Sequence, residues 1–259
     1  MNNNKWKSQR KQSYFINMRR YHNSIKRELY NKYTQDKSVL ELAIGRFGDG
    51  QKLFENNVKM VVGYDIDASS ILEAKRRLRE YSLDFQSKVI LDVKDLSKEV
   101  IKGNKEFDVV SCMFALHYFF RTEETFKAIL KSIDNNLRVG GIFMATLFDG
   151  KSILKRLEEP FSDPEHFQLH QKQHTENKNL FGNKVNVLIK DNNLTLSANY
   201  NPEDEYIVDA DIFIRLMENL GFELIESKMF GEYDSFKFNL SSTEKDISFL
   251  NRTFVFRRK

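Results

Sequence analysis

Apolar and polar positions alternate along residues 38–150 in a way that predicts strands and helices in turn. Apolar runs that end in turn residues predict strands over 38–44, 58–67, 86–92, 107–114 and 141–150. Helical spacing predicts helices near 51–56, over 69–82 with Ser69 or Ser70 as N-cap, and from Thr122 to a stop at Gly140–Gly141. The alternation predicts a doubly wound α/β sheet that is mostly parallel, with right-handed crossovers.

This alternation stops after Lys151. Residues 160–203 are polar, rich in Asn and Lys, and contain all three prolines of the chain, which predicts an insertion lying over the sheet with a hairpin around 184–200. A helix then ends at Gly221, a strand follows it, and residues 252–259 have the alternation of a final antiparallel edge strand. We therefore expect a basic arm over 1–18 and one domain over 19–259, with the insertion at about 158–203.

The composition of the 259 residues fits one large α/β domain, since 41% are hydrophobic and 30% are charged. No apolar run approaches the roughly 20 residues that a membrane helix needs. The polar, basic N-terminus does not resemble a secretory signal. The single cysteine, Cys112, excludes an internal disulfide and is expected to be a buried small side chain.

Positive charge is concentrated at the N-terminus. Residues 1–37 hold ten Lys or Arg against two acids, a net +8, so that the rest of the chain sums to −4 within the total of +4. The aromatic residues interleaved with these charges are Tyr14, Phe15, Tyr21, Tyr30 and Tyr33. Basic and aromatic residues together suit an RNA partner. A solvated helix face with aromatic side chains packing inward fits the same segment equally well.

Ligands of open α/β sheets bind at the carboxyl ends of the strands. The residues expected there are Gly45 and Gly48, Asp65 and Asp67, Asp92 and Asp95, and finally Met113, Phe114, His117 and Tyr118. An acid after the second strand accepts hydrogen bonds from ribose hydroxyls. The glycine spacing is not that of a dinucleotide site, and no GxxxxGK[ST] phosphate loop is present. S-adenosylmethionine, an adenosine ligand without a pyrophosphate, fits this layout, because an acidic rim suits its cationic sulfonium.

Four further segments stand out: RRYHNSIKRELY, VLELAIGRFGDGQKLF, FDVVSCMFALHYFF and EYIVDADIFIRLMENLGFELI. Together they resemble segments of mRNA cap guanine-N7 methyltransferases, most of all those encoded by large DNA viruses. The resemblance implies a class I, Rossmann-like methyltransferase fold with a seven-stranded, mostly parallel sheet and helices on both faces. It implies methyl transfer from S-adenosylmethionine to N7 of the cap guanosine of mRNA. Another methyltransferase, or a non-catalytic cofactor-binding subunit of a capping complex, remains the alternative.

The resemblance also implies roles for individual residues. For the cofactor, Lys26 would hold the methionine carboxylate, and Asp95, or second to it Asp92, would reach the adenine amino group. The remaining cofactor positions are Ala43, Gly45 and Asp49 under the methionine, Asp65 and Ile66 at the ribose, and Met113 at the adenine. Asn23 would lie near the cap phosphates or the cofactor. The other cap positions are Phe114, His117 and Tyr118 as walls and Glu205 on the guanine edge. Guanine N7 has a free lone pair, so His117, Tyr118 and Glu205 are expected to position the base, with no residue acting as acid or base.

The chain departs from the family pattern in its cofactor loop. Ala43–Ile44 replaces a pair of small residues and Phe47 stands where glycine is common, which predicts a narrower loop. Asn251 lies where the family has a cap-facing tyrosine, so that role is not transferred. The plainer alternatives are core closure for His117–Tyr118 and surface positions for Glu205 and Lys26.

The histidines His166, His170 and His174 would share one face of a helix, as metal ligands can. Because their segment is polar and lacks cysteine, we expect a loop or hairpin over the cap and no metal. The expected partners are capped RNA and RNA triphosphatase and guanylyltransferase domains, on the same chain or another, with no membrane. The expected location is the cytoplasm, or a viral factory or virion if the chain is viral, with the nucleus as the alternative for a cellular protein.

Overall fold

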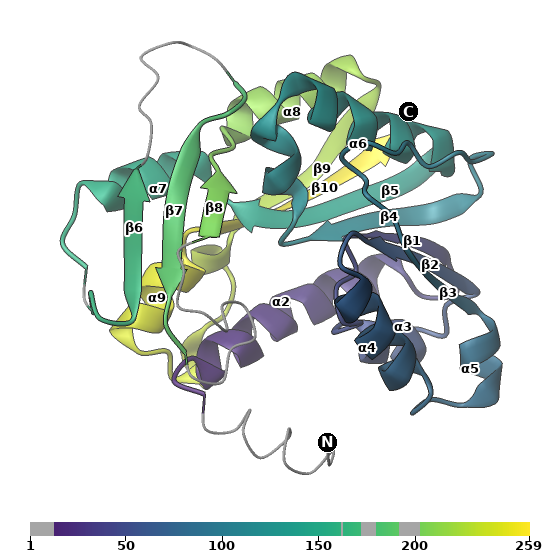
Figure 1. Cartoon of the computed structure of the whole chain (residues 1–259), viewed down its shortest axis with the longest axis horizontal. Coiled ribbons are helices and arrows are strands. Elements are labelled where there is room, and N and C mark those ends of the chain that lie inside the picture. The colour runs from purple at the N-terminus through teal and green to yellow at the C-terminus, as the bar shows by residue number, and fades with distance from the viewer. Residues whose placement is uncertain (1–12, 162, 172–179, 192–202) are drawn as a thin grey trace.

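A computed structural model describes residues 13–161, 163–171, 180–191 and 203–259 (Figure 1). Their main sheet has seven strands in the order β3-β2-β1-β4-β5-β10-β9. The strands are β1 (Ser38–Leu42), β2 (Met60–Asp65), β3 (Val89–Val93), β4 (Phe107–Met113), β5 (Leu137–Phe148), β9 (Phe222–Met229) and β10 (Asn251–Arg258). Strands β1 to β5 are parallel, and β10 is antiparallel to both of its neighbours. The predicted doubly wound, mostly parallel sheet is thus confirmed.

Helices cover both faces of this sheet. On one face, apolar side chains of α2 (Ile16–Tyr33), α3 (Gly50–Glu55), α4 (Ala68–Leu78) and α5 (Leu83–Ser87) pack into a common cluster. On the other face, α6 (Glu123–Asn136) and α8 (Ala210–Asn219) supply the core. Five short helices complete the helices of the described residues: α7 (Gly150–Leu157), α9 (Ser242–Ser248), η1 (Leu116–Arg121), η2 (Phe230–Glu232) and η3 (Phe236–Phe238).

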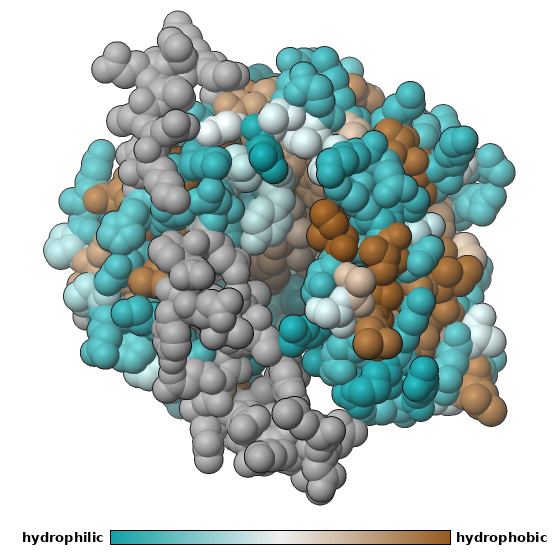
Figure 2. Space-filling view, in the orientation of Figure 1, coloured by the Kyte–Doolittle hydropathy of each residue, from teal (hydrophilic) through white to brown (hydrophobic). Residues whose placement is uncertain are grey.

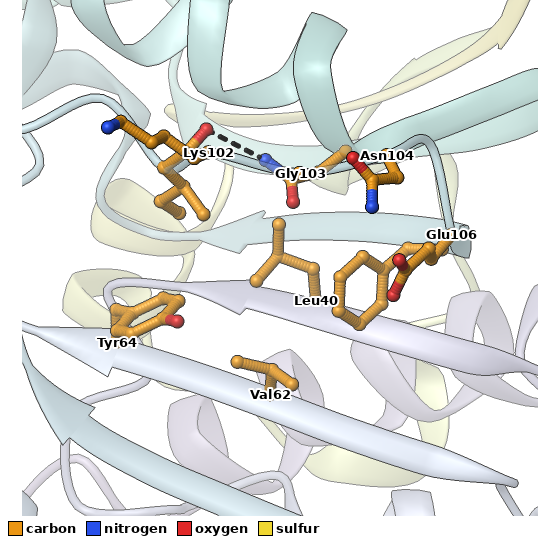
Figure 3. Close-up of a pocket in the computed structure, with 10 residues that line it drawn as sticks. Leu40, Val62, Tyr64, Lys102, Gly103, Asn104 and Glu106 are labelled. Atoms are coloured by element: carbon orange, nitrogen blue, oxygen red, sulfur yellow. Dashed lines mark hydrogen bonds between the residues drawn. The ribbon is translucent and has the colours of Figure 1, made fainter.

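The connection from β3 to β4 contains no helix over residues 94–106, so the face of β2 and β3 on the α6 side is partly open. A cavity of about 340 Å³ lies there, with Leu40, Val62 and Tyr64 on the sheet and Gly103 and Asn104 on the connection (Figure 3). Figure 2 shows hydrophobic side chains among hydrophilic ones on the right half of this face of the molecule. No residue that lines the cavity is among those predicted for cofactor or cap.

Two helix boundaries differ from the predicted ones. The glycine pair does not stop α6, which ends at Asn136, where the side-chain amide closes the last turn on the carbonyl of Ser132. Gly140, at φ 75°, lies inside β5 next to a shift in the register with β4. The glycine pair therefore accommodates a β-bulge-like irregularity of the strand. Asp67, and neither Ser69 nor Ser70, is the N-cap of α4, because its carboxylate accepts the amide hydrogens of both serines.

The insertion forms a second, three-stranded antiparallel sheet from β6 (Phe167–Gln171), β7 (Lys184–Ile189) and β8 (Glu203–Tyr206). β7 pairs antiparallel with both β6 and β8. The second half of the hairpin predicted around 184–200 lies outside the described residues. In Figure 1, α2 runs from the region of this small sheet and α9 toward α3, and so links the small-sheet region with the helices on the main sheet.

The final strand is antiparallel, as predicted, but it does not lie at the edge. β10 sits between β5 and β9, and most of its residues are buried, which is typical of an interior strand. β9 forms that edge of the sheet instead, with mostly half-buried residues.

The histidine spacing does not fall on a helix. His166 precedes β6 and His170 lies within it, whereas His174 is outside the described residues. Among described residues, no group of three His, Cys, Asp or Glu side chains is placed to hold a metal. The same part of the chain contains no helix that is long and apolar enough to cross a membrane. Residues 1–12 of the basic arm also lie outside it, and Ile16 already belongs to α2.

Candidate active site

The loop after β1 takes a left-handed backbone at Ala43 (φ 56°), Gly45 (φ 56°) and Phe47 (φ 59°). The amide of Gly45 donates to Oδ2 of Asp65 at 2.7 Å, which fixes the loop to the end of β2. A Cβ atom at Gly45 would meet no atom within 4 Å. The loop therefore combines a backbone that favours glycine with open space beside it, as the approach of a ligand requires.

The predicted narrowing of this loop is wrong. The side chain of Phe47 is only 3% exposed and packs in the core with Tyr81 and Phe85, at ring distances of 6.1 and 6.5 Å. Ile44 covers Gly63 on β2, where a Cβ atom would come within 2.4 Å of Ile44 Cδ1. The positive φ of Phe47 turns its bulky side chain away from the ligand side, a direction that the sequence alone did not indicate.

The two acids that follow β2 have different tasks. Asp65 accepts the amides of Gly45 and Asp67 on its two carboxylate oxygens. Asp67 caps α4 and is committed to that helix. Asp65 is thus the acid that faces the loop, next to Ile66, which is 65% exposed.

A buried charge cluster joins α2 to the start of α3. The Nζ atoms of Lys26 and Lys52 lie 2.8 and 2.6 Å from the two carboxylate oxygens of Asp49. Lys52 also donates to Oδ1 of Asn23 at 2.9 Å. Burial by itself raises the pKa of Asp49, but the two ammonium groups outweigh it and lower that pKa below its ordinary value. Lys26, Asp49 and Asn23 thus lie together, and Lys52 joins them without having been predicted from the sequence.

The two acids proposed for adenine lie at the end of β3. Asp92 is exposed and accepts the amide of Val93. Asp95 accepts the amide and hydroxyl of Ser97, which together with Lys98 lower its pKa. The choice between them stays a prediction. Met113 ends β4, with its Sδ 3.7 Å from Thr146 Oγ1.

Helix η1 begins two residues after Phe114, and its neighbouring residues His117 and Tyr118 differ in exposure. His117 is 3% exposed, and Tyr118, the next residue, is 42% exposed. Glu205 of β8 reaches both of them from 87 residues away: Tyr118 Oη donates to its Oε1 at 3.1 Å, and His117 Nε2 contacts its Oε2. The structure thus brings together three of the four residues that the family resemblance placed around the guanine.

Hydrogen bonds among the described residues do not fully satisfy His117 and Glu205. The contact between them has the proximity of an ion pair without the alignment of a hydrogen bond. Nε2 of His117 and Oε2 of Glu205 thus have only each other, and Nδ1 of His117 is buried without a hydrogen bond among the described residues. Because buried polar groups in native proteins are rarely left unsatisfied, this cluster is typical of a site that a polar ligand completes.

Phe114 forms a second aromatic group against α2. It has φ 56°, and its amide donates to the carbonyl and the hydroxyl of Thr146. Its ring stacks on His22 with centroids 5.4 Å apart, and Lys26 Nζ lies 5.7 Å from the ring centroid. Burial, with help from the charge of Lys26, lowers the pKa of His22, which keeps that imidazole neutral. His22 is a residue of this region that the sequence analysis missed.

Several further positions are structural. Asn251 is buried and its amide donates to the carbonyls of Ile247 and Ser248, so it caps α9 and takes no cap-facing role. Cys112 is fully buried, as predicted. The aromatic side chains of Phe15, Tyr21 and Tyr30 are also fully buried. For these three rings, inward packing is the correct alternative, and stacking on RNA is not.

The buried carboxyl group of Glu41 predicts a pH-dependent stability. Tyr30 Oη donates to both of its oxygens at 2.9 Å, and burial raises the pKa of Glu41 to about 7. The folded protein therefore holds a proton that the unfolded chain releases above about pH 4.5, so this contribution to stability is lost as the pH rises to about 7. Glu41→Gln removes this ionisable group. We therefore expect its free energy of unfolding to rise by roughly 3 kcal/mol relative to that of the parent protein between pH 4.5 and 7.

Urea unfolding of both proteins at several pH values measures this difference. A difference in the free energy of unfolding that stays constant between pH 4.5 and 7 would show that Glu41 ionises normally in the folded state.

Comparison with known proteins agrees with this geometry. Residues 1–253 match the family model described as the mRNA (guanine-N(7))-methyltransferase domain. The mRNA cap guanine-N(7) methyltransferase of Saccharomyces cerevisiae is 29% identical over 255 residues, which cover 88% of this chain and 55% of that protein. The probable mRNA-capping enzyme of Acanthamoeba polyphaga mimivirus is 27% identical over 256 residues, covering 82% of this chain and 21% of that protein.

Solved structures show the same fold. A putative S-adenosylmethionine-dependent methyltransferase from Listeria monocytogenes matches 92% of this chain and 97% of its own with a TM-score of 0.62 at 16% identity. The glycopeptide N-methyltransferase MtfA in complex with S-adenosylmethionine matches 90% of this chain and 86% of its own with a TM-score of 0.57 at 14% identity.

The chain spans only 37 to 58% of the length of three similar curated relatives, all of them mRNA cap guanine-N(7) methyltransferases. The family model nevertheless covers nearly the whole sequence. The chain belongs to the mRNA (guanine-N(7))-methyltransferase family.

Proposed function

We propose that this chain transfers the methyl group of S-adenosylmethionine to N7 of the guanosine cap of mRNA. The observation that carries the proposal is the convergence of Glu205, His117 and Tyr118, where the buried carboxylate of Glu205 contacts both other side chains and Nδ1 of His117 has no hydrogen bond among the described residues. The Watson–Crick edge of guanine presents N1–H and N2–H donors side by side. A carboxylate can accept both of them, so Glu205 would fix the orientation of the base.

The cofactor would lie along the loop after β1. Its methionine end is a zwitterion, and the cluster at the start of α3 offers a cation and an anion 2.8 Å apart in Lys26 and Asp49. Lys26 would take the carboxylate and Asp49 the ammonium group. Asp65 would accept the ribose hydroxyls with its remaining lone pairs, and Gly45 leaves room for the chain of the methionine.

The chemistry needs orientation more than proton transfer. Bound S-adenosylmethionine would supply an electrophilic methyl group on its sulfonium: the N7 lone pair would form the N7–C bond as the S–C bond breaks, and the leaving group would be a neutral thioether. Holding N7 in line with that bond can supply on the order of 7–11 kcal/mol. Because N7 becomes cationic, the carboxylate of Glu205 also favours the transition state over the ground state.

The loop geometry supports an enzyme over a non-catalytic subunit. A narrowed cofactor loop would favour a non-catalytic subunit, but the side chain of Phe47 lies in the core and leaves the loop open.

We also propose that the chain works beside RNA triphosphatase and guanylyltransferase domains, on its own or another chain. The proposed location is the cytoplasm, or a viral factory or virion if the chain is viral, and the nucleus if it is cellular.

The proposal is tested by labelled methyl transfer to two RNAs of one sequence, one capped with GpppG and one ending in a triphosphate. We expect label only on the capped RNA, released as N7-methylguanosine after nuclease digestion. Equal labelling of the two RNAs, or label on an internal base, would refute the cap as the substrate. Stabilisation of the fold by S-adenosylhomocysteine tests cofactor binding separately.

A further inference from the structure

Lys52 is a buried cation for which the proposed chemistry gives no role. Only 3% of its side chain is exposed, although lysine is among the residues least often buried. Its ammonium group donates to Asp49 Oδ1 at 2.6 Å and to Asn23 Oδ1 at 2.9 Å. Asn23 in turn donates from its amide to the carbonyl of Arg19. Lys52 therefore ties the start of α3 to α2 through two side chains that the sequence assigned to the site.

The charges of this cluster are unbalanced. Two ammonium groups, of Lys26 and Lys52, surround the single carboxylate of Asp49. Lys26 is the more accessible of the two, with 14% of its side chain exposed, and it also lies near the ring of Phe114. The excess positive charge suits an arriving anion, and Lys26 is the cation that can meet it.

We propose that Lys52 is a positioning residue that keeps Asp49 neutralised and in place, and so frees Lys26 for the carboxylate of the cofactor. This inference rests on the proposed cofactor and goes beyond it, because it says why Lys26 is available. Without Lys52, Lys26 would be the only cation of the protein against a largely buried carboxylate. If Lys26 then turned to the carboxylate of the cofactor, the ammonium group of the cofactor could replace it on one oxygen of Asp49, but the other oxygen, which Lys52 now occupies, would have no cation.

Removal of the Lys52 charge should weaken binding only at the amino acid end of the cofactor. S-adenosylhomocysteine carries the amino acid group, whereas 5′-methylthioadenosine keeps the adenosine and the thioether and lacks that group. Lys52→Met, of similar length without charge, should weaken S-adenosylhomocysteine binding by at least about tenfold, the value of one hydrogen bond to a charged group. Its affinity for 5′-methylthioadenosine should stay within about twofold of the parent value, because no contact of the nucleoside depends on Lys52.

Isothermal titration with both ligands measures the ratio of the two affinities for each variant. Lys52→Arg, which retains the charge, should restore the ratio at least in part. Lys32→Met is the matched control, because it removes a lysine with a 2.8 Å ion pair, to Glu226, outside the cluster. Its ratio should equal that of the parent protein. If Lys52→Met does not fold, Lys52→Gln, with a polar end, replaces it under the same expectation.

Equal losses for both ligands would overturn the inference, because they would reveal a general structural role for Lys52. An unchanged affinity for S-adenosylhomocysteine would overturn it as well. The assay involves no RNA, so its result is independent of the substrate. A selective loss in a chain that fails to methylate capped RNA would support the role of Lys52 and contradict the proposed cap substrate.

Discussion

Replacement of Glu205 by glutamine is expected to lower kcat/KM for capped RNA by about 10² to 10³, because the site loses hydrogen bonds to a charged acceptor. A carboxylate accepts from both N1–H and N2–H of guanine. The amide of glutamine keeps one acceptor and turns a donor toward a guanine donor, which adds repulsion to the lost bond. The charge that favours a cationic N7 also disappears, so the loss should fall on kcat as well as on KM.

Steady-state methylation of capped RNA, together with titration of S-adenosylhomocysteine, measures this effect. The affinity for S-adenosylhomocysteine should remain at the parent value, since Glu205 lies on β8 and the cofactor loop follows β1. Asp204→Asn is a matched control on the same strand, because Asp204 pairs with Lys184 and is 37% exposed. Its kcat/KM should stay within about threefold of the parent. Full activity of Glu205→Gln would remove Glu205 from the guanine pocket.

Replacement of Asp65 by alanine is expected to weaken S-adenosylhomocysteine binding by at least about a hundredfold. Asp65 would accept both ribose hydroxyls of the cofactor, and its carboxylate also holds the amide of Gly45 at 2.7 Å. The variant thus loses a direct contact with the ligand and the anchor of the loop beneath the methionine. Binding of a cap analogue, which uses Glu205 and its neighbours, should be almost unchanged.

Asp67→Ala provides the control for Asp65→Ala, because it removes the acid two residues further along the same turn. Asp67 caps α4, so its loss should lower the melting temperature and change the cofactor affinity little. Thermal unfolding and titration of both variants separate the two effects. If Asp67→Ala weakened S-adenosylhomocysteine binding as much as Asp65→Ala, the assignment of the ribose to Asp65 would be wrong.

The sequence by itself determined where the strands end and which residues follow them. Apolar runs of strand length mark a buried parallel sheet, and the residues just beyond them must lie at its carboxyl edge. For this reason Gly45, Asp65 and His117 could be placed near one another from the order of the elements alone. The resemblance to a family added Lys26 and Glu205, which no periodicity identifies.

Only the tertiary structure decided how side chains from distant segments meet. Glu205 reaches His117 because the insertion folds into its own sheet, whose β8 lies beside η1. Phe47 enters the core because its backbone is left-handed, and Lys52 joins the charge cluster because α3 packs against α2. Periodicity reports which face of an element is buried, but the direction of one side chain and its partner depend on packing between elements. That is the physical reason why the sequence located the site and only the fold assembled it.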